Sequence, residues 1–299
     1  MTGTFSLLAL VVLTASGTID GTEDRLEATG LSLAVPFCDG VLAVPWGYGE
    51  LLFIGPGESP EPFPIIWGEA RPCSPPSTSG DCAAICLERQ GHEFILLFSI
   101  AGESKEYGPY LECGAPVFDG EGSVWFTADG MLMVDGVPTG HQLDAHTISV
   151  DPPGNIVVYC DGDDRLCLLE TESGGNRILS SCSRFYAPSV VDFGGETFII
   201  SSTLEGYICM TCPRSGDSTR LARGSHPFWW SGGGFLLYSV TEDDGHNITS
   251  SEIWAHRPGW LPFRMTSSPS VHEIMPLVLN DVLMAIDSDT GSLLTLPQP

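Results

Sequence analysis

One short pattern, an apolar run followed by a glycine-containing turn and a second apolar run, recurs along almost the whole chain. Its clearest copy is HPFWWSGGGFLLY, which starts at His226. Short runs rich in aromatic and branched residues on either side of such a turn are typical of β-hairpins. Aligned on the turn, the copies stand at Gly40, Gly91, Gly122, Gly154, Gly195, Gly234 and Asn280, at intervals of 51, 31, 32, 41, 39 and 46 residues. Repeats of about 40 residues, each with room for four short strands, predict an all-β fold, the β-propeller.

The repeats predict a single propeller domain over residues 24–299 with seven four-stranded blades. The unit that starts at Ala187 shows four runs, APSVV, ETFIIS, GYICMTC and STRLA, whereas the last unit shows only three. The segment RLEATG, which starts at Arg25, is therefore expected to act as an N-terminal strand that closes the ring. Residues 55–82 read as a long decorated loop. Six blades are the alternative, because the unit after Gly91 has no clear fourth strand.

The middle of the chain carries a family resemblance. HPFWWSGGGFLLYSVTEDDGHN followed by SEIW resembles the TolB-like and PD40-type (WD40-like) propeller repeats, and ISVDPPGNIVVYCDGDDRLCLL is similar to them. The resemblance covers residues 115–297. It implies a scaffold found in periplasmic binding proteins, in propeller domains of prolyl peptidases and in some polysaccharide lyases. It implies no particular activity, and the GxSxG motif of a serine hydrolase does not occur in the sequence.

The charge balance narrows the class of partner. The formal net charge is −26, because 38 acidic residues face only 12 basic ones, of which one is lysine. Such a surface repels phosphate backbones and anionic headgroups, so we expect no nucleic acid and no anionic membrane as partner. A cationic protein or small ligand is expected instead, bound by a monomer.

The start of the chain and the cysteines both favour export. The apolar run FSLLALVVLTA, from Phe5, precedes Ala15-Ser16-Gly17, so residues 1–17 are predicted to be a signal peptide and the protein to be extracytoplasmic, that is secreted, periplasmic or at the cell surface. No other run is long enough to span a membrane. Ten cysteines fit an oxidising compartment. The expected disulfides are Cys160–Cys167, across the turn DGDDR, and Cys73–Cys82, across SPPSTSGD.

Acidic residues concentrate in the loops predicted to join the second and third strand of each blade. These loops share one face with the segments that lead into the innermost strands, so that face is expected to be acidic. The residues concerned are Glu103, Glu106, Asp129, Asp161, Asp163, Asp164, Glu205, Glu242, Asp243, Asp244, Asp287 and Asp289. Among them Asp161, Asp163, Asp164, Glu242, Asp243 and Asp244 are the candidate ligand-binding carboxylates. They would attract a cationic partner or Ca²⁺, although turns favour Asp for conformational reasons as well.

Three of the seven histidines open or precede predicted innermost strands. His146, His226 and His272, with Asp144 nearby, would then ring the mouth of the central channel. Imidazoles beside carboxylates suit Zn²⁺ or Mn²⁺, so a divalent cation is a possible cofactor. A metal there would make the protein a lyase or hydrolase. The competing interpretation is that these are ordinary residues at the ends of strands.

Aromatic residues supply a third candidate site. Trp229, Trp230 and Trp254 belong to one unit and would stack on a sugar or peptide if exposed, although alternation places about half of such residues in a core. The sequence favours a non-enzymatic propeller that binds through an acidic face. A metal-dependent lyase or hydrolase and a structural surface or envelope component are the alternatives.

Overall fold

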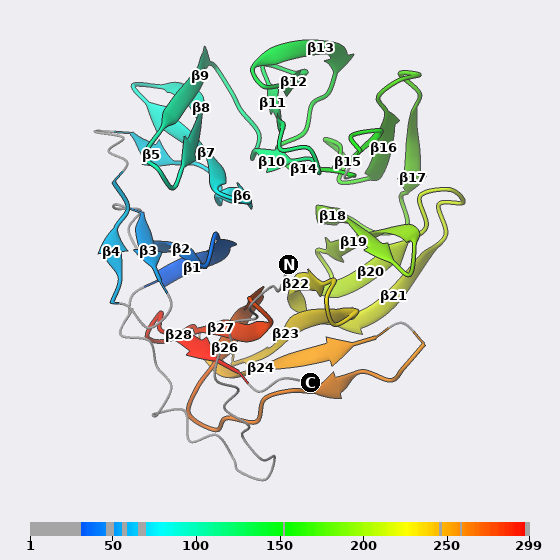
Figure 1. The fold of residues 1–299 in the computed structure, drawn as a ribbon. Coiled ribbons are helices and arrows are strands. Elements are labelled where there is room, and N and C mark those ends of the chain that lie inside the picture. The colour runs from blue at the N-terminus through cyan, green and yellow to red at the C-terminus, as the bar shows by residue number, and fades with distance from the viewer. Residues whose placement is uncertain are drawn as a thin grey trace, which may run out of the picture.

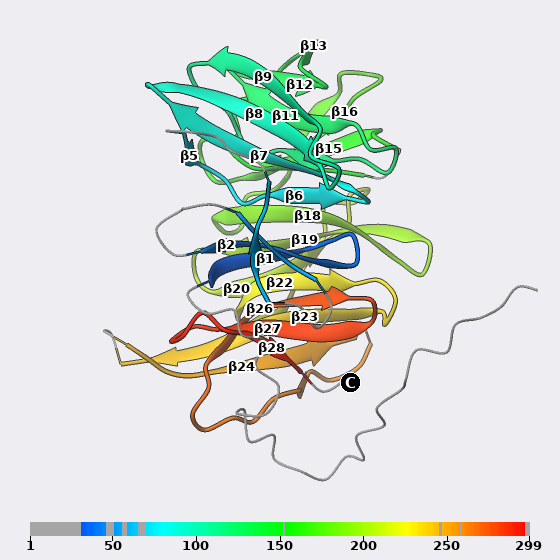
Figure 2. The ribbon, with the colours of Figure 1, turned by 60° about the vertical axis from the view of Figure 1, so that its left-hand side comes forward.

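The structure, a computed structural model, describes residues 31–45, 51–55, 59–64, 70–151, 153–244, 247–257 and 259–296. These residues form antiparallel sheets and no helix. Figure 1 looks onto a ring of seven such sheets, which are the blades of a propeller, and Figure 2 shows the sheets stacked beside one another. The predicted fold class and the count of seven blades are confirmed, and the six-bladed alternative is wrong.

The blades follow one another in chain order. Blades 1 and 2 contain β1 (Leu31–Phe37), β2 (Gly40–Pro45), β3 (Leu52–Ile54) and β4 (Glu61–Pro62), then β5 (Arg71–Pro72), β6 (Ser77–Ser79), β7 (Cys82–Arg89), β8 (His92–Ser99) and β9 (Ser104–Tyr110). Blades 3 and 4 contain β10 (Val117–Phe118), β11 (Val124–Ala128), β12 (Met131–Val134) and β13 (Val137–Gln142), then β14 (Ile148–Val150), β15 (Ile156–Cys160), β16 (Leu166–Glu170) and β17 (Asn176–Ser180).

Blades 5 to 7 complete the ring. They contain β18 (Phe185–Phe193), β19 (Glu196–Thr203), β20 (Tyr207–Thr211) and β21 (Ser218–Arg223), then β22 (Ser225–Trp230), β23 (Phe235–Asp243), β24 (Ile248–His256) and β25 (Phe263–Arg264), then β26 (Glu273–Leu279), β27 (Val282–Asp287) and β28 (Leu293–Thr295). Blade 7 has three strands among the described residues. The segment at residues 25–30 that we expected to add the fourth lies outside them, as does the expected signal peptide.

The core is divided into seven apolar clusters, one at each junction between neighbouring blades. Alternation along the strands explains this division, since successive side chains point to opposite faces of a sheet. On β19, for example, Ile199 packs towards blade 4 and Ile200 towards blade 6. Each blade therefore buries both of its faces against its two neighbours.

The ring closes between the first and the last blade. Leu31 and Ala34 of β1 share a buried cluster with Leu277 of β26, and the two blades lie side by side in Figure 1. The backbone N–H of Leu31 also donates to the carbonyl of Gly291, 3.1 Å away, in the turn between β27 and β28. The beginning and the end of the described chain are thus joined by apolar packing and a hydrogen bond.

Blade 2 departs from the predicted layout. Its innermost strand is divided into β5 and β6, which pair along the same edge of β7, and Pro75 and Pro76 interrupt it because proline lacks the N–H that the ladder requires. Residues 70–79 are thus part of the blade, not of a decorated loop. The turn after the first strand is Gly80-Asp81, and Gly91 belongs to the turn between the second and third strands. With Gly80 in place of Gly91, the intervals of 51 and 31 residues become 40 and 42.

The structure does not form the predicted Cys160–Cys167 disulfide, and all ten cysteines are free thiols. Cys160 is paired with Leu166, and Cys167 with Tyr159, so the two sulfurs lie on opposite faces of blade 4. Cys160 packs at the junction with blade 5 and Cys167 at the junction with blade 3. Side chains that point apart in this way cannot be bridged without a shift of register.

The Cys73–Cys82 disulfide is not formed either. The backbone N–H of Cys73 donates to the carbonyl of Cys86, 2.8 Å away, so Cys73 lies beside Cys86. Cys86 is four positions after Cys82 on the extended strand β7, which is about 13 Å along the strand. A disulfide requires Cα atoms within about 7 Å.

Blades 5, 6 and 7 share one irregularity in their innermost strands. The ladder between the first and second strands shifts register around Ala187, His226 and Met275, and each of these residues has a positive φ and precedes a proline. A β-bulge explains both features. The ladder of hydrogen bonds is interrupted at the extra residue, so the proline that follows it, which has no N–H, leaves no ladder bond unmade. His226 therefore occupies a repeated bulge.

No helix in the described ranges is long and apolar enough to cross a membrane.

Candidate functional site

The loops predicted to share one face do lie together. We call this face the upper face and define it by the turns between second and third strands and the linkers that lead into the innermost strands. Backbone hydrogen bonds join the two sets: Asp129 N–H to Glu112 O, Phe185 N–H to Asp164 O, Leu204 N–H to Arg184 O, Gly224 N–H to Gly206 O and Ser288 N–H to His272 O. The blade plan inferred from the sequence therefore places these loops correctly outside blade 2.

Two of the acidic residues expected there lie elsewhere. The misplaced turn at Gly91 assigned Glu103 and Glu106 to the upper face, whereas they lie at or near the start of β9, after the turn that joins the third strand of blade 2 to its fourth. Glu106 accepts from Arg89 at 2.9 Å. Asp287, a third residue of the expected set, is buried at the end of β27.

The carboxylates of blade 4 are paired with arginines. Arg165 contacts Asp161 at 2.6 Å and Asp163 at 3.2 Å, while Arg184 contacts Asp164 at 2.6 Å. Burial alone would raise the pKa of Asp161, but its hydrogen bonds with Arg165 and with the backbone outweigh burial and lower that pKa. This part of the upper face is therefore partly neutralised by the chain itself.

The carboxylates of blade 6 lie at the far end of the β23–β24 hairpin. Glu242 accepts from the Ser250 hydroxyl at 3.3 Å, and Asp244 accepts from the backbone N–H of Asn247 at 2.8 Å. Asp243 is the last residue of β23 and is exposed. Glu242 and Asp244 thus contribute hydrogen bonds at the end of this hairpin.

A hollow lies on the upper face where blade 3 meets blade 4. Its lining comprises Glu112, Gly114, Thr127, Ala128, Asp129, Gly130, Leu143, Asp144, Ala145 and His146. Three elements form it, namely the linker into β10, the turn between β11 and β12, and the linker into β14. The lining contains three carboxylates and one histidine, and neither arginine nor lysine belongs to this set.

Hydrogen bonds fix the walls of the hollow. One carboxylate oxygen of Asp129 accepts from the backbone N–H groups of Leu111 and Glu112, at 2.9 and 3.2 Å. The Thr127 hydroxyl donates to the carbonyl of Ala145 at 2.5 Å. The side chains at the rim are held by fewer contacts within the hollow. The exposed Glu112 carboxylate contacts the exposed His146 imidazole at 3.3 Å and none of the other groups just named.

Gly114 allows the linkers to approach. Its N–H donates to the Thr127 carbonyl at 2.9 Å, and the next N–H, of Ala115, donates to the His146 carbonyl at 2.8 Å. A Cβ on Gly114 would lie 2.8 Å from the His146 carbonyl oxygen and would overlap the Thr127 hydroxyl. The floor of the hollow therefore requires glycine here.

The structure does not bring the three candidate metal-binding histidines together. His146 faces Glu112, His226 contacts Ser225 at 3.1 Å, and His272 faces Asp289 at 3.2 Å, in three different blades. Asp144 lies beside His146 in the hollow and accompanies neither of the others. The upper-face positions of His146 and His272 agree with the sequence interpretation, but a shared set of ligands is not formed.

The three candidate tryptophans pack at blade junctions. Trp229 and Trp254 are half-buried between blades 5 and 6, and Trp230 packs between blades 6 and 7. The indole N–H of Trp229 donates to the Asp192 carbonyl at 3.1 Å. Trp229 and Trp230 end β22 at the edge opposite the upper face, so they lie apart from the carboxylates.

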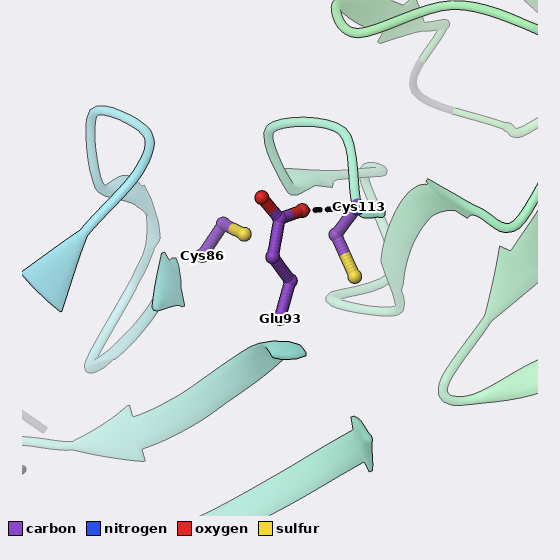
Figure 3. A group of neighbouring side chains, drawn as sticks. All are labelled: Cys86, Glu93 and Cys113. Carbon is purple, nitrogen blue, oxygen red and sulfur yellow. Dashed lines mark hydrogen bonds between the residues drawn. The ribbon is translucent and has the colours of Figure 1, made fainter. Parts of the chain in front are cut away.

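The sequence interpretation missed a group of sulfurs between blades 2 and 3. Cys86 of β7, Glu93 of β8 and Cys113 of the following linker place one ligand atom each within 4.8 Å of the others (Figure 3). A hydrogen bond with the Cys113 thiol, followed by burial, raises the pKa of Cys86. Cys86 and Glu93 flank the hairpin turn at Gly91, but Cys113 comes from a later linker that no local pattern pairs with them. A first turn of blade 2 at Gly80 would in addition predict that Cys73 lies on the strand next to Cys86.

Comparisons with known proteins support the fold but do not show a family. No protein-family model and no curated protein matches the chain. Among solved structures, a chain in the crystal structure of the mitotic checkpoint complex is similar with a TM-score of 0.66 and 10% identity, covering 99% of both chains.

Two further solved structures have the same overall shape. YCF48 bound to D1 peptide has a TM-score of 0.64 and 12% identity, covering 92% of this chain and 96% of the other. A catalytically inactive variant of virginiamycin B lyase from Staphylococcus aureus, with quinupristin, has a TM-score of 0.63 and 13% identity over 92% and 98%. The set thus spans several kinds of propeller, and the TolB-like relationship in particular is not shown.

Proposed function

We propose that this propeller is a non-catalytic binding protein whose upper face captures a cationic segment of a partner protein. The observation that carries the proposal is the composition of the hollow at the junction of blades 3 and 4. Glu112, Asp129 and Asp144 gather around it, and its lining includes no arginine or lysine. A concave surface of one charge focuses the field and attracts the opposite charge.

The wider chain reinforces this local charge. With a net charge of −26, the field around the whole molecule is negative, so a basic partner is attracted before contact and an acidic one is repelled. Propellers also serve as binding scaffolds elsewhere, as in the complex of YCF48 with a peptide. That likeness supports a binding role without indicating the partner.

The enzymatic alternative is less well supported by the geometry. It requires His146, His226 and His272 to share a metal, and these side chains have separate contacts in separate blades. The structural alternative predicts no selective capture of cations, so one binding experiment separates it from the proposal.

The test is binding of a fluorescent nona-lysine peptide to the purified full chain, with spermine and a nona-glutamate peptide for comparison. We expect the lysine peptide to bind at low ionic strength and to weaken steeply towards about 0.5 M salt, where screening is nearly complete over a few ångströms. The double variant Glu112→Gln/Asp144→Asn should bind about tenfold more weakly, while the control Asp163→Asn should bind almost as the parent does. Equal binding by all three proteins, or tighter binding of the glutamate peptide, would contradict the proposal. Capture of spermine alone would assign the face to a small polycation.

A further inference from the structure

The group between blades 2 and 3 combines ligands that a metal ion would use. Cys86 and Cys113 are buried, and Glu93 is half-buried between them. Their three ligand atoms lie within 4.8 Å of one another. Figure 3 shows the Glu93 carboxylate turned towards the space between the two sulfurs. Within the described residues, it is the one group of three or more His, Cys, Asp or Glu side chains gathered this closely.

A fourth donor lies next to this group. The Cys73 thiol is exposed and donates to the Arg71 carbonyl at 3.5 Å, and the Cys73 backbone is held beside β7 by its bond to the Cys86 carbonyl. Cys73 occupies the break in the innermost strand of blade 2, just before Pro75. The interruption that divides β5 from β6 thus brings a third sulfur close to the group, although Cys73 Sγ lies outside the set of atoms that are within 4.8 Å of one another.

The surroundings hold the donors in position. One oxygen of Glu93 accepts from the backbone N–H of Cys113, which leaves the other free to act as a ligand. The backbone N–H of Cys86 donates to the Ser74 hydroxyl at 3.0 Å. Such outer hydrogen bonds orient ligands in metal sites. A tetrahedral Zn²⁺ site, with bonds of about 2.3 Å to sulfur and about 2.1 Å to oxygen, needs ligand atoms roughly 3.5 to 3.8 Å apart. Small side-chain rotations of Cys86, Glu93 and Cys113 would achieve this spacing, whereas the Cys73 thiol has to turn away from the Arg71 carbonyl.

We propose that Cys73, Cys86, Glu93 and Cys113 bind one borderline-soft divalent cation of the Zn²⁺ class, which joins blade 2 to blade 3. Three thiolates and a carboxylate suit such an ion better than Ca²⁺ or Mg²⁺, which take oxygen ligands. Binding releases the three thiol protons to solvent and involves no change of oxidation state. All four positions come from the protein, so the site is closed and structural rather than catalytic.

A disulfide is the competing fate of these thiols. Cys86–Cys113 or Cys73–Cys86 would form by loss of two electrons to an external oxidant and would leave the third thiol unpaired. A metal ion uses all three sulfurs together with the carboxylate, and only the metal gives Glu93 a role as ligand. The two outcomes differ in measurable ways.

The test is elemental analysis of the untagged full chain, purified with a reductant, supplied with Zn²⁺ and then dialysed. We expect one Zn²⁺ per chain and, after exchange into Co²⁺, the intense visible and near-ultraviolet bands of a thiolate-ligated tetrahedral ion. Cys86→Ser/Cys113→Ser should lose both signals. Glu93→Gln, a milder change, should retain the fold and bind Zn²⁺ at least tenfold more weakly. Cys160→Ser, a cysteine outside the group, should bind as the parent does.

Three results would overturn the proposal. The first is absence of Zn²⁺ and of the Co²⁺ bands in the reduced parent protein. The second is Zn²⁺ binding that is as tight as the parent's in both variants, Glu93→Gln and Cys86→Ser/Cys113→Ser. The third is a Cys86–Cys113 or Cys73–Cys86 disulfide, found by mass spectrometry of unreduced peptides from protein purified without reductant, in a protein that still binds no Zn²⁺ after the disulfide has been reduced. The absence of the Co²⁺ bands from the parent protein would by itself contradict the proposal, so the proposal remains testable even if the double variant does not fold.

Discussion

Blades 3 and 4 both present acidic residues on the upper face, yet their carboxylates are in opposite electrostatic situations. In blade 4, Arg165 and Arg184 contact all three aspartates of the turn. Around the hollow of blade 3, the exposed Glu112 carboxylate faces a histidine instead. A count of acidic residues therefore overstates the binding surface, because what attracts a partner is the charge left after internal pairing.

A buried carboxylate that has other carboxylates as neighbours is the extreme case in this comparison. It gives the largest expected effect on stability. Glu273 is 2% exposed, and burial raises its pKa to about 7, reinforced by the nearby carboxylates of Glu252 and Asp287. The folded protein then holds a proton that the unfolded chain releases above its ordinary pKa of 4.5, so stability falls as pH rises from about 4.5 through about 7. Glu273→Gln should remove this loss, which is on the order of 3 kcal/mol above pH 7.

Urea unfolding of both proteins at pH 5 and pH 8 measures this difference. We expect the variant to gain stability over the parent at pH 8 and to show little advantage at pH 5. An equal gain at both pH values would mean that the substitution acts through packing and not through charge.

The backbone of the two blades provides the next prediction. Gly114→Ala in the floor of the hollow should destabilise the protein by roughly 2 kcal/mol, because the new methyl group collides with the His146 carbonyl and the Thr127 hydroxyl. Gly162→Ala in the acidic turn of blade 4 is the matched control, since its Cβ would meet no atom within 4 Å. Chemical denaturation of the two variants should separate them clearly, and similar midpoints would show that the linkers can move apart at little cost.

The smallest expected effect reverses the pairing in blade 4. Arg165→Gln leaves Asp161 and Asp163 without their shared guanidinium and should raise affinity for the nona-lysine peptide about twofold to threefold at low salt. The comparison predicts no such gain from Arg177→Gln, since Arg177 donates to the Pro213 carbonyl and to neither aspartate. Fluorescence titration of the peptide resolves this difference. If both variants gain equally, the field of the whole molecule determines affinity and the local pairing does not.

The sequence was sufficient for the parts of the fold that depend on local pattern. Turn residues and apolar runs repeat along the chain except in the innermost strand of blade 2, so the fold, the preference for seven blades over six and the position of Asp144 and His146 on the upper face followed from them. Pairings between distant residues did not follow. Whether the Asp164 carboxylate is paired depends on Arg184, and the strands β16 and β17 lie between these two residues in the sequence.

The errors in blade 2 have one physical origin. Pro75 and Pro76 divide its innermost strand into pieces too short to form a recognisable apolar run, so the stronger hairpin around Gly91 has the pattern expected at the start of a unit. That shift by one strand concealed the approach of Cys73 to Cys86. It also suggested a disulfide between cysteines that neighbour each other in sequence, although register decides which sulfurs can meet.

The divided strand of blade 2 also bears on symmetry. A ring of seven similar blades looks nearly the same after each step of rotation about its axis, so a ligand centred on that axis would have several equivalent orientations. The break between β5 and β6 lies beside the innermost strands of both neighbouring blades and occurs in no other described blade. The break thus distinguishes blade 2 from the other described blades, so a ligand on the axis would not meet seven equivalent orientations.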